Sequence, residues 1–262
     1  MLPRVIPCLL LKGDGLVKGV RFKDHKYVGD PINAVRIFNE KEVDELLFLD
    51  VTASSEGRIP PIPLIEKLAD ECFMPFGVGG GIKTVEQCRE VLYAGAEKVC
   101  ITTAALDDPA LIERAAGMFG SQSVLVGLEV RKSLFGGYRL SGNSGKRVVK
   151  RDPVEFAKEM ESRGAGELLV TSVDCDGTMR GYDLRLVEEI SSAVSIPVIA
   201  CGGAGAVDDI QRVLSQGGAS AASAGSLFVF HGPKRAVLIT FPERQILEER
   251  LTNLPRAEIN HE

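Results

Sequence analysis

The segment Pro75-Phe76-Gly77-Val78-Gly79-Gly80-Gly81 decides the fold, because it recurs 122 positions later as Pro197-Val198-Ile199-Ala200-Cys201-Gly202-Gly203. Each copy is a short apolar run that ends in glycines, as expected for a buried parallel strand that turns into a helix. The same offset relates Glu45-Leu46-Leu47 to Glu167-Leu168-Leu169 without gaps. A repeat at a fixed spacing indicates two similar halves of four βα units each.

Other apolar runs alternate with amphipathic stretches along the chain. The predicted strands are Val5–Leu11, Leu46–Val51, Phe76–Gly79, Val99–Thr102, Val124–Val130, Leu168–Val173, Val198–Cys201 and Ala219–Ala224. The predicted helices include Val85–Ala94, Pro109–Phe119, Pro153–Arg163, Leu184–Val194 and Val207–Gln216. This order predicts a single α/β domain, a (β/α)8 TIM barrel with a two-fold half-barrel repeat; an open doubly wound sheet is the alternative. We assign residues 1–230 to the barrel, with half-barrels at about 1–122 and 123–230, and 231–262 to a C-terminal tail or helix.

Composition narrows the function classes. The chain has 262 residues, 45% of them hydrophobic, which suits one barrel of roughly 250 residues. A net charge of −5 argues against a nucleic-acid partner, and no apolar run reaches the roughly 20 residues of a membrane span. The six cysteines form no CxxC pair and the three histidines are scattered, so we expect reduced thiols, a cytoplasmic protein, and neither a metal nor a cofactor.

Two segments interrupt the βα alternation. Lys12–Gly29 follows the first strand, is rich in glycine and lysine, and is expected to be a long loop over the active face. Arg131–Lys150 follows the fifth strand, contains Gly136-Gly137 and Gly142-Asn143-Ser144-Gly145, and is expected to form a small hairpin. The alternative for both is a surface loop without function.

The glycine-ended strands predict anion sites. After Gly80-Gly81 and after Gly202-Gly203, backbone N–H groups can approach an anion closely, and the following helix adds donors. The next strands end in Thr102-Thr103 and in Gly225-Ser226, whose hydroxyls could complete each cradle. Two such cradles at one barrel mouth would suit a ligand with a phosphate-type group at each end. Turn geometry alone is the alternative explanation for the glycines.

Carboxylates also follow the strands, where barrel enzymes keep their catalytic groups. They are Asp50, Glu129, Asp174 and Asp176. A pair of them could act as general acid and base, although loop capping is a strong alternative for Asp174. The first strand lacks any acid, and Leu10, near its expected end, can neither accept nor donate a proton.

Charged residues stand at four strand starts, at the opposite end of the predicted barrel. They are Arg4, Glu45, Lys98 and Glu167. Two positive and two negative groups from different strands could close into a ring that gates an axial passage. Four separately solvated charges are the alternative.

The chain resembles the cyclase subunit family of imidazole glycerol phosphate synthase over roughly residues 1–230. The motifs that carry the resemblance include Ile6-Pro7-Cys8-Leu9, Val17-Lys18-Gly19, Gly29-Asp30-Pro31, Phe48-Leu49-Asp50, Gly79-Gly80-Gly81-Ile82, Gly164-Ala165-Gly166-Glu167 and Asp174-Cys175-Asp176-Gly177-Thr178. The resemblance implies a glutaminase partner on the N-terminal face and ammonia passing along the barrel axis, with the family's gate at the four strand-start charges. It also implies two phosphate sites, at Gly81, Thr102 and Thr103, and at Asp176, Gly177, Gly203, Gly225 and Ser226, with Lys18 at the mouth.

Three family positions differ. The aspartate that the family needs on strand one falls at Leu10, its second catalytic aspartate falls at Glu129, and the asparagine of its first phosphate site falls at Thr102. Losing an acid–base group typically costs about 10²–10⁴-fold in rate. We therefore expect weak or absent cyclisation.

A divergent branch of the family is more similar, at Ile6–Lys12, Asp30–Val35, Ala219–Gly225 and Arg235–Pro242. This resemblance implies a subunit that passes glutamine-derived ammonia to an N-acetyl sugar amidotransferase, in the synthesis of acetamidino sugars for bacterial surface polysaccharides. The alternatives are a working cyclase of histidine biosynthesis and a non-catalytic subunit that binds a phosphorylated small molecule and regulates its partner.

Overall fold

Eight parallel strands close into a barrel in the computed structural model, which describes residues 2–133 and 136–252. They are β1 (Arg4–Lys12), β4 (Leu46–Asp50), β5 (Phe76–Gly79), β6 (Lys98–Ile101), β7 (Val124–Lys132), β10 (Glu167–Ser172), β11 (Val198–Cys201) and β12 (Ala221–Ala224). Each strand pairs with the next, and β12 returns to pair with β1. The predicted α/β barrel is therefore confirmed, and the open sheet is excluded because the strands form no edge.

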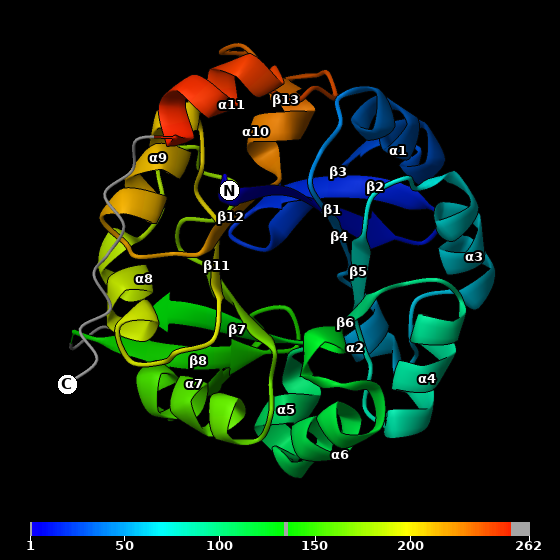
Figure 1. Ribbon diagram of the computed structural model, residues 1–262, viewed down its shortest axis with the longest axis vertical. Coiled ribbons are helices and arrows are strands. Elements are labelled where there is room, and N and C mark those ends of the chain that lie inside the picture. The colour runs from blue at the N-terminus through cyan, green and yellow to red at the C-terminus, as the bar shows by residue number, and fades with distance from the viewer. Residues whose placement is uncertain (1, 134–135, 253–262) are drawn as a thin grey trace.

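Helices surround the strands (Figure 1). The longer ones are α1 (Pro31–Glu40), α3 (Ile62–Glu71), α4 (Val85–Tyr93), α6 (Ala110–Phe119), α7 (Pro153–Ser162), α8 (Leu184–Ser191) and α9 (Val207–Ser215). The short elements α2 (Ala53–Glu56), α5 (Thr103–Asp107), η1 (Ser121–Ser123) and α10 (Ser226–Val229) follow strand ends or helices. Asp30, Thr84 and Asp152 start their helices by accepting hydrogen bonds from backbone N–H groups of the first turn.

The period of two along β1 separates two apolar cores. Val5, Leu9 and Leu11 face outward and pack in the large cluster beneath the helices. Ile6, Cys8 and Leu10 face inward and join Leu47, Cys100, Leu125, Leu169, Ile199, Cys201 and Ala221 along the barrel interior. The barrel axis is thus lined by aliphatic groups and thiols.

The segment after β1 is a hairpin rather than the loop predicted for Lys12–Gly29, although it lies over the active face as predicted. Strands β2 (Gly15–Val20) and β3 (Lys23–Gly29) pair with each other, and β2 also pairs with β1. The buried residues Leu16, Val17 and Val28 hold the hairpin against the barrel although its glycines and lysines suggested a loop. The predicted hairpin after the fifth strand is confirmed, as β8 (Tyr138–Gly142) and β9 (Arg147–Val149).

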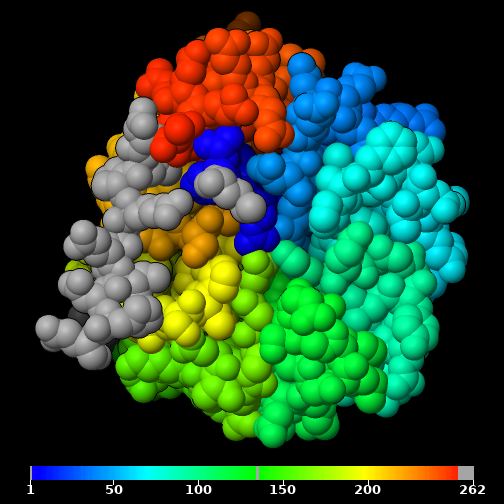
Figure 2. Space-filling view, in the orientation of Figure 1, coloured from blue at the N-terminus to red at the C-terminus, as the bar shows by residue number. Residues whose placement is uncertain are grey.

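The chain continues past the barrel through β13 (Phe230–His231), β14 (Ala236–Val237) and α11 (Arg244–Leu251). Phe241 anchors this segment, with its ring 6.4 Å from Phe38 and 4.9 Å from Phe228. Helix α11 lies beside the N-terminus on the face seen in Figure 2. Residues 253–262 of the predicted tail lie outside the described residues, and the half-barrel boundaries stay a prediction. Among the described residues, no helix combines the length and apolar character needed to cross a membrane.

Candidate functional site

A cavity opens at the carboxyl ends of the barrel strands. Seven of the eight strands contribute to its lining, beginning with Cys8 and Leu10 from β1 and including Glu129 from β7, and the eighth, β5, leads into it through Gly80 and Gly81. The β2–β3 hairpin adds Lys18, Phe22 and His25 from above. The predicted site residues Gly80, Gly81, Thr102, Thr103, Asp176, Gly177, Gly202, Gly203, Gly225 and Ser226 all line it.

The first anion cradle is partly occupied by the protein itself. The Gly81 N–H donates to Ser54 Oγ at 3.2 Å, and the Asn143 N–H donates to Thr103 Oγ1 at 2.8 Å. Gly81 has a φ of +69°, and a Cβ there would collide with the Arg58 carbonyl oxygen. Packing against the α2 region therefore requires glycine at this turn whether or not an anion binds.

The second cradle contains a buried ion pair and two polar atoms without partners. Lys18 Nζ lies 2.8 Å from Asp176 Oδ1, and both side chains are buried. Burial would lower the pKa of Lys18, but the charge and hydrogen bond of Asp176 outweigh it and raise this pKa. Asp176 Oδ2 and Ser226 Oγ are buried without a hydrogen-bond partner among the described residues. Unpaired buried polar atoms are uncommon in folded proteins, so this cradle is the stronger candidate for a ligand.

Glu129, one of the four predicted mouth acids, faces the cavity with a raised pKa. Burial raises its pKa to about 7, even though the Gly145 N–H donates to its carboxylate at 2.7 Å. Asp50 lines the cavity but is saturated by Thr52, the Ala53 N–H and Arg58, which lies 2.6 Å from its Oδ2. Glu129 is therefore the mouth acid best suited to exchange a proton near neutral pH.

Asp174 does not line the cavity, so its prediction as a mouth acid was wrong. Its carboxylate accepts the Lys132 N–H at 2.7 Å and joins the sixth-strand loop to the end of β7. The loop-capping alternative accounts for this residue. Leu10, in contrast, lies where expected, on the cavity wall and in the inner apolar cluster.

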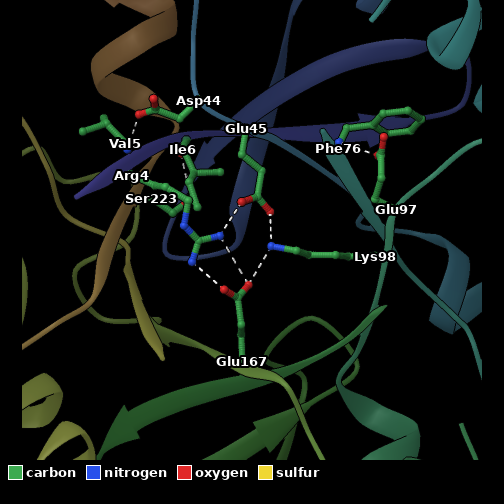
Figure 3. Close-up of polar contacts among 10 residues, drawn as sticks. All are labelled: Arg4, Val5, Ile6, Asp44, Glu45, Phe76, Glu97, Lys98, Glu167 and Ser223. Carbon is green, nitrogen blue, oxygen red and sulfur yellow. Dashed lines mark hydrogen bonds and ion pairs between the residues drawn. The ribbon is translucent and has the colours of Figure 1, made fainter. Parts of the chain in front are cut away.

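The four strand-start charges meet in a closed ring at the opposite end of the barrel (Figure 3). Arg4 lies 2.5 Å from Glu45 and 2.5 Å from Glu167, and Lys98 lies 2.8 Å from each of the same two carboxylates. Asp44 and Glu97 hold the neighbouring strands by accepting the backbone N–H groups of Val5 and Phe76. The ring therefore has two positive and two negative charges, and it lies across the end of the apolar barrel interior on strands that these hydrogen bonds hold in place.

Sequence reasoning missed several cavity residues. They include Cys8, Phe22, His25, Ser54, Cys100, Ser144 and Cys201. His25 was missed because its segment was taken as a loop; the buried Leu16, Val17 and Val28 around polar residues are the signal of a hairpin that could have placed it.

The comparisons with known proteins agree with this architecture. The family model described as histidine biosynthesis protein matches residues 4–233. A Pseudomonas aeruginosa protein with the provisional name imidazole glycerol phosphate synthase subunit hisF2 is 54% identical over 92% of this chain and 96% of its own length. The imidazole glycerol phosphate synthase subunit HisF of Hyphomonas neptunium is 46% identical over 87% of this chain and 90% of its own. That of Alkaliphilus metalliredigens is 43% identical over the same shares.

Proposed function

This chain belongs to the histidine biosynthesis protein family, and from that premise we propose that it is the ammonia-accepting barrel subunit of a glutamine-dependent enzyme of the imidazole glycerol phosphate synthase type. The single observation that carries the proposal is the position of the charged ring relative to the barrel interior. Arg4, Glu45, Lys98 and Glu167 close one end of the apolar barrel interior, and the other end of that interior meets the mouth cavity.

The chemistry of ammonia suits this arrangement. Neutral ammonia loses far less free energy than ammonium on entering an apolar interior, because ammonium would lose the hydration of a full charge without a counter-charge. The paired ring gives no net charge to hold ammonium, and one ion pair has to open before a molecule can pass. A glutaminase docked on the N-terminal face would release ammonia at the ring, so a glutaminase is the proposed partner.

The fate of the ammonia distinguishes two candidates. In the first, the chain passes it to an N-acetyl sugar amidotransferase for the synthesis of acetamidino sugars; the absence of an acid at Leu10 and the branch motifs support this. In the second, the chain is the cyclase of histidine biosynthesis. The names of its relatives favour this candidate, as do Glu129, with its pKa of about 7, and the second anion cradle.

A purified-protein assay separates the candidates. The cyclase predicts imidazole glycerol phosphate formation from the histidine-pathway intermediate and ammonium salt, whereas the conduit predicts little turnover. Both require a complex with a cognate glutaminase, which size-exclusion chromatography with light scattering detects. Absence of that complex with two folded proteins contradicts the proposed function in both forms.

A regulatory subunit remains a third candidate, motivated by the second cradle alone. It predicts that a bis-phosphorylated ligand binds and changes glutamine hydrolysis without incorporation of ammonia. Calorimetry with such a ligand tests it, and absence of any heat of binding removes it.

A further inference from the structure

The β2–β3 hairpin places one histidine beside the second anion cradle. The Arg21 N–H donates to the Asp176 carbonyl oxygen at 2.9 Å, and Arg21 Nε donates to the Asp174 carbonyl oxygen at 3.1 Å. These bonds fix the hairpin on the loop that carries Asp176. The half-buried His25 then lines the same cavity as Lys18 and Ser226. A Cβ on Gly19 would lie 2.9 Å from His25 Cδ2, so this glycine leaves room for the ring.

Lys18 and His25 are the side chains able to carry positive charge that line the cavity at this cradle, and Arg235 reaches it from outside by donating to the Gly177 carbonyl oxygen at 2.8 Å. The charge of Lys18 is already paired with Asp176 at 2.8 Å. Ser226 Oγ and Asp176 Oδ2 have no hydrogen-bond partner among the described residues. The His25 ring makes no hydrogen bond within residues 2–133 and 136–252. Of the two histidines in those ranges, only His25 lines the cavity. A dianion in the cradle needs an additional donor with charge, and an imidazolium supplies both.

We propose that His25, in its imidazolium form, contacts a phosphate-type dianion at the second cradle and makes its binding pH-dependent. The inference deepens the proposed function, because it names the residue that matches the mouth to a doubly charged ligand. Lys12 and Lys18 face His25 as cations, Asp24 and Asp176 face it as anions, and Glu129 lies in the same cavity.

The sign of the pH dependence follows from these neighbours. Burial, then Lys12 and Lys18, lower the pKa of His25 below its ordinary value of 6.5 in the empty site. A bound dianion stabilises the imidazolium and raises this pKa, so binding takes up a proton. Affinity is then highest below the pKa of the free protein and falls as the pH rises toward the pKa of the complex.

Sulfate is the appropriate probe, since it stays a dianion from pH 5 to 8.5. Imidazole resonances are followed by NMR during sulfate titrations of the full chain, with His25→Gln to assign His25 and His231→Gln as the matched control at an exposed position. We expect sulfate to raise the pKa of His25 alone and to bind roughly tenfold more tightly at pH 5 than at pH 8, the change that one pKa unit produces. We expect His25→Gln to lose that part of the pH dependence and His25→Lys to bind sulfate tightly at both pH values. Because Glu129 is present in the variants and in the unchanged protein, comparing their affinities at the same pH cancels any effect of its titration.

Two results would overturn the inference: sulfate that binds without moving the His25 pKa, or sulfate that does not bind at all. The titration needs no glutaminase. A failure here therefore leaves complex formation untouched, and a failed complex leaves the His25 result standing.

Discussion

Lys98 Nζ and Glu45 Oε1 lie 2.8 Å apart across the amino-terminal end of the barrel, although 53 residues separate them in the sequence. Glu167 lies 2.8 Å from the same ammonium, so Lys98 bridges two carboxylates that would otherwise repel each other. Arg4 bridges the same two carboxylates from the other side. Burial would lower the pKa of Arg4, but the hydrogen bonds and charges of Glu167 and Glu45 outweigh this effect and raise it. Each of the two cations is thus shared by both carboxylates in the closed ring.

Removing the Lys98 charge should uncouple glutamine hydrolysis from ammonia use. In Lys98→Met the two carboxylates lose a shared partner and the ring no longer closes in one geometry. We expect nitrogen incorporation from glutamine to fall roughly tenfold, the effect of about 1.4 kcal/mol on a barrier. Incorporation from added ammonium salt should stay unchanged. Amide-¹⁵N glutamine in the reconstituted system measures both, and Lys67→Met, at an exposed site on α3, is the control. Equal losses from both nitrogen sources would refute a gating role.

An acid at position 10 should restore proton transfer at the mouth. Leu10→Asp places a carboxylate on the cavity wall that also carries Glu129. We expect ammonium-dependent formation of imidazole glycerol phosphate to rise by about 10²-fold or more, the typical contribution of one acid–base group. Leu10→Asn, of similar size, should not gain activity. High turnover by the unchanged protein would contradict the importance given to Leu10.

The Lys18–Asp176 pair should show the energetics of a buried ion pair. Lys18→Met leaves Asp176 buried without its cation, and we expect a loss of about 3–5 kcal/mol in the free energy of unfolding. Urea unfolding measures it. The double variant Lys18→Met with Asp176→Asn should recover most of the loss. A single variant as stable as the unchanged protein would mean that the pair does not form.

Glu129 should make the fold less stable as the pH rises. Its pKa of about 7 exceeds the roughly 4.3 of an unfolded chain, so the folded protein holds the extra proton between these values. The contribution of Glu129 to the free energy of unfolding is greatest below pH 4.3 and declines toward pH 7, by on the order of 3 kcal/mol. Glu129→Gln should remove the decline, which the difference between the two unfolding curves from pH 5 to 8 measures. Parallel curves would show that the carboxylate is not desolvated.

Much of the barrel could be predicted because its strands are buried on both faces. Phe76–Gly79 and Val198–Cys201 have the predicted bounds. They lie 122 positions apart, and each ends in a glycine turn at the same place in its half of the barrel. The β2–β3 hairpin could not be recognised from glycine and lysine content, since its few apolar residues are hidden among polar ones. Its misassignment also concealed His25.

The sequence placed most candidate residues at the correct end of a strand but could not state their contacts. Asp174 and Asp176 are two positions apart, yet one caps a loop and the other is buried with Lys18. Strand ends fix the height of a residue in the barrel, whereas the direction of a loop side chain depends on partners from distant segments. The ring of four charges likewise required barrel closure to bring Arg4 and Glu167 together.

The most direct test of the account is the rate of glutamine hydrolysis by the cognate glutaminase, titrated with this chain. If the barrel accepts ammonia at its charged ring, the rate should rise and saturate at one barrel per glutaminase. A flat rate across the titration, with both proteins folded and no complex formed, would contradict the central claim.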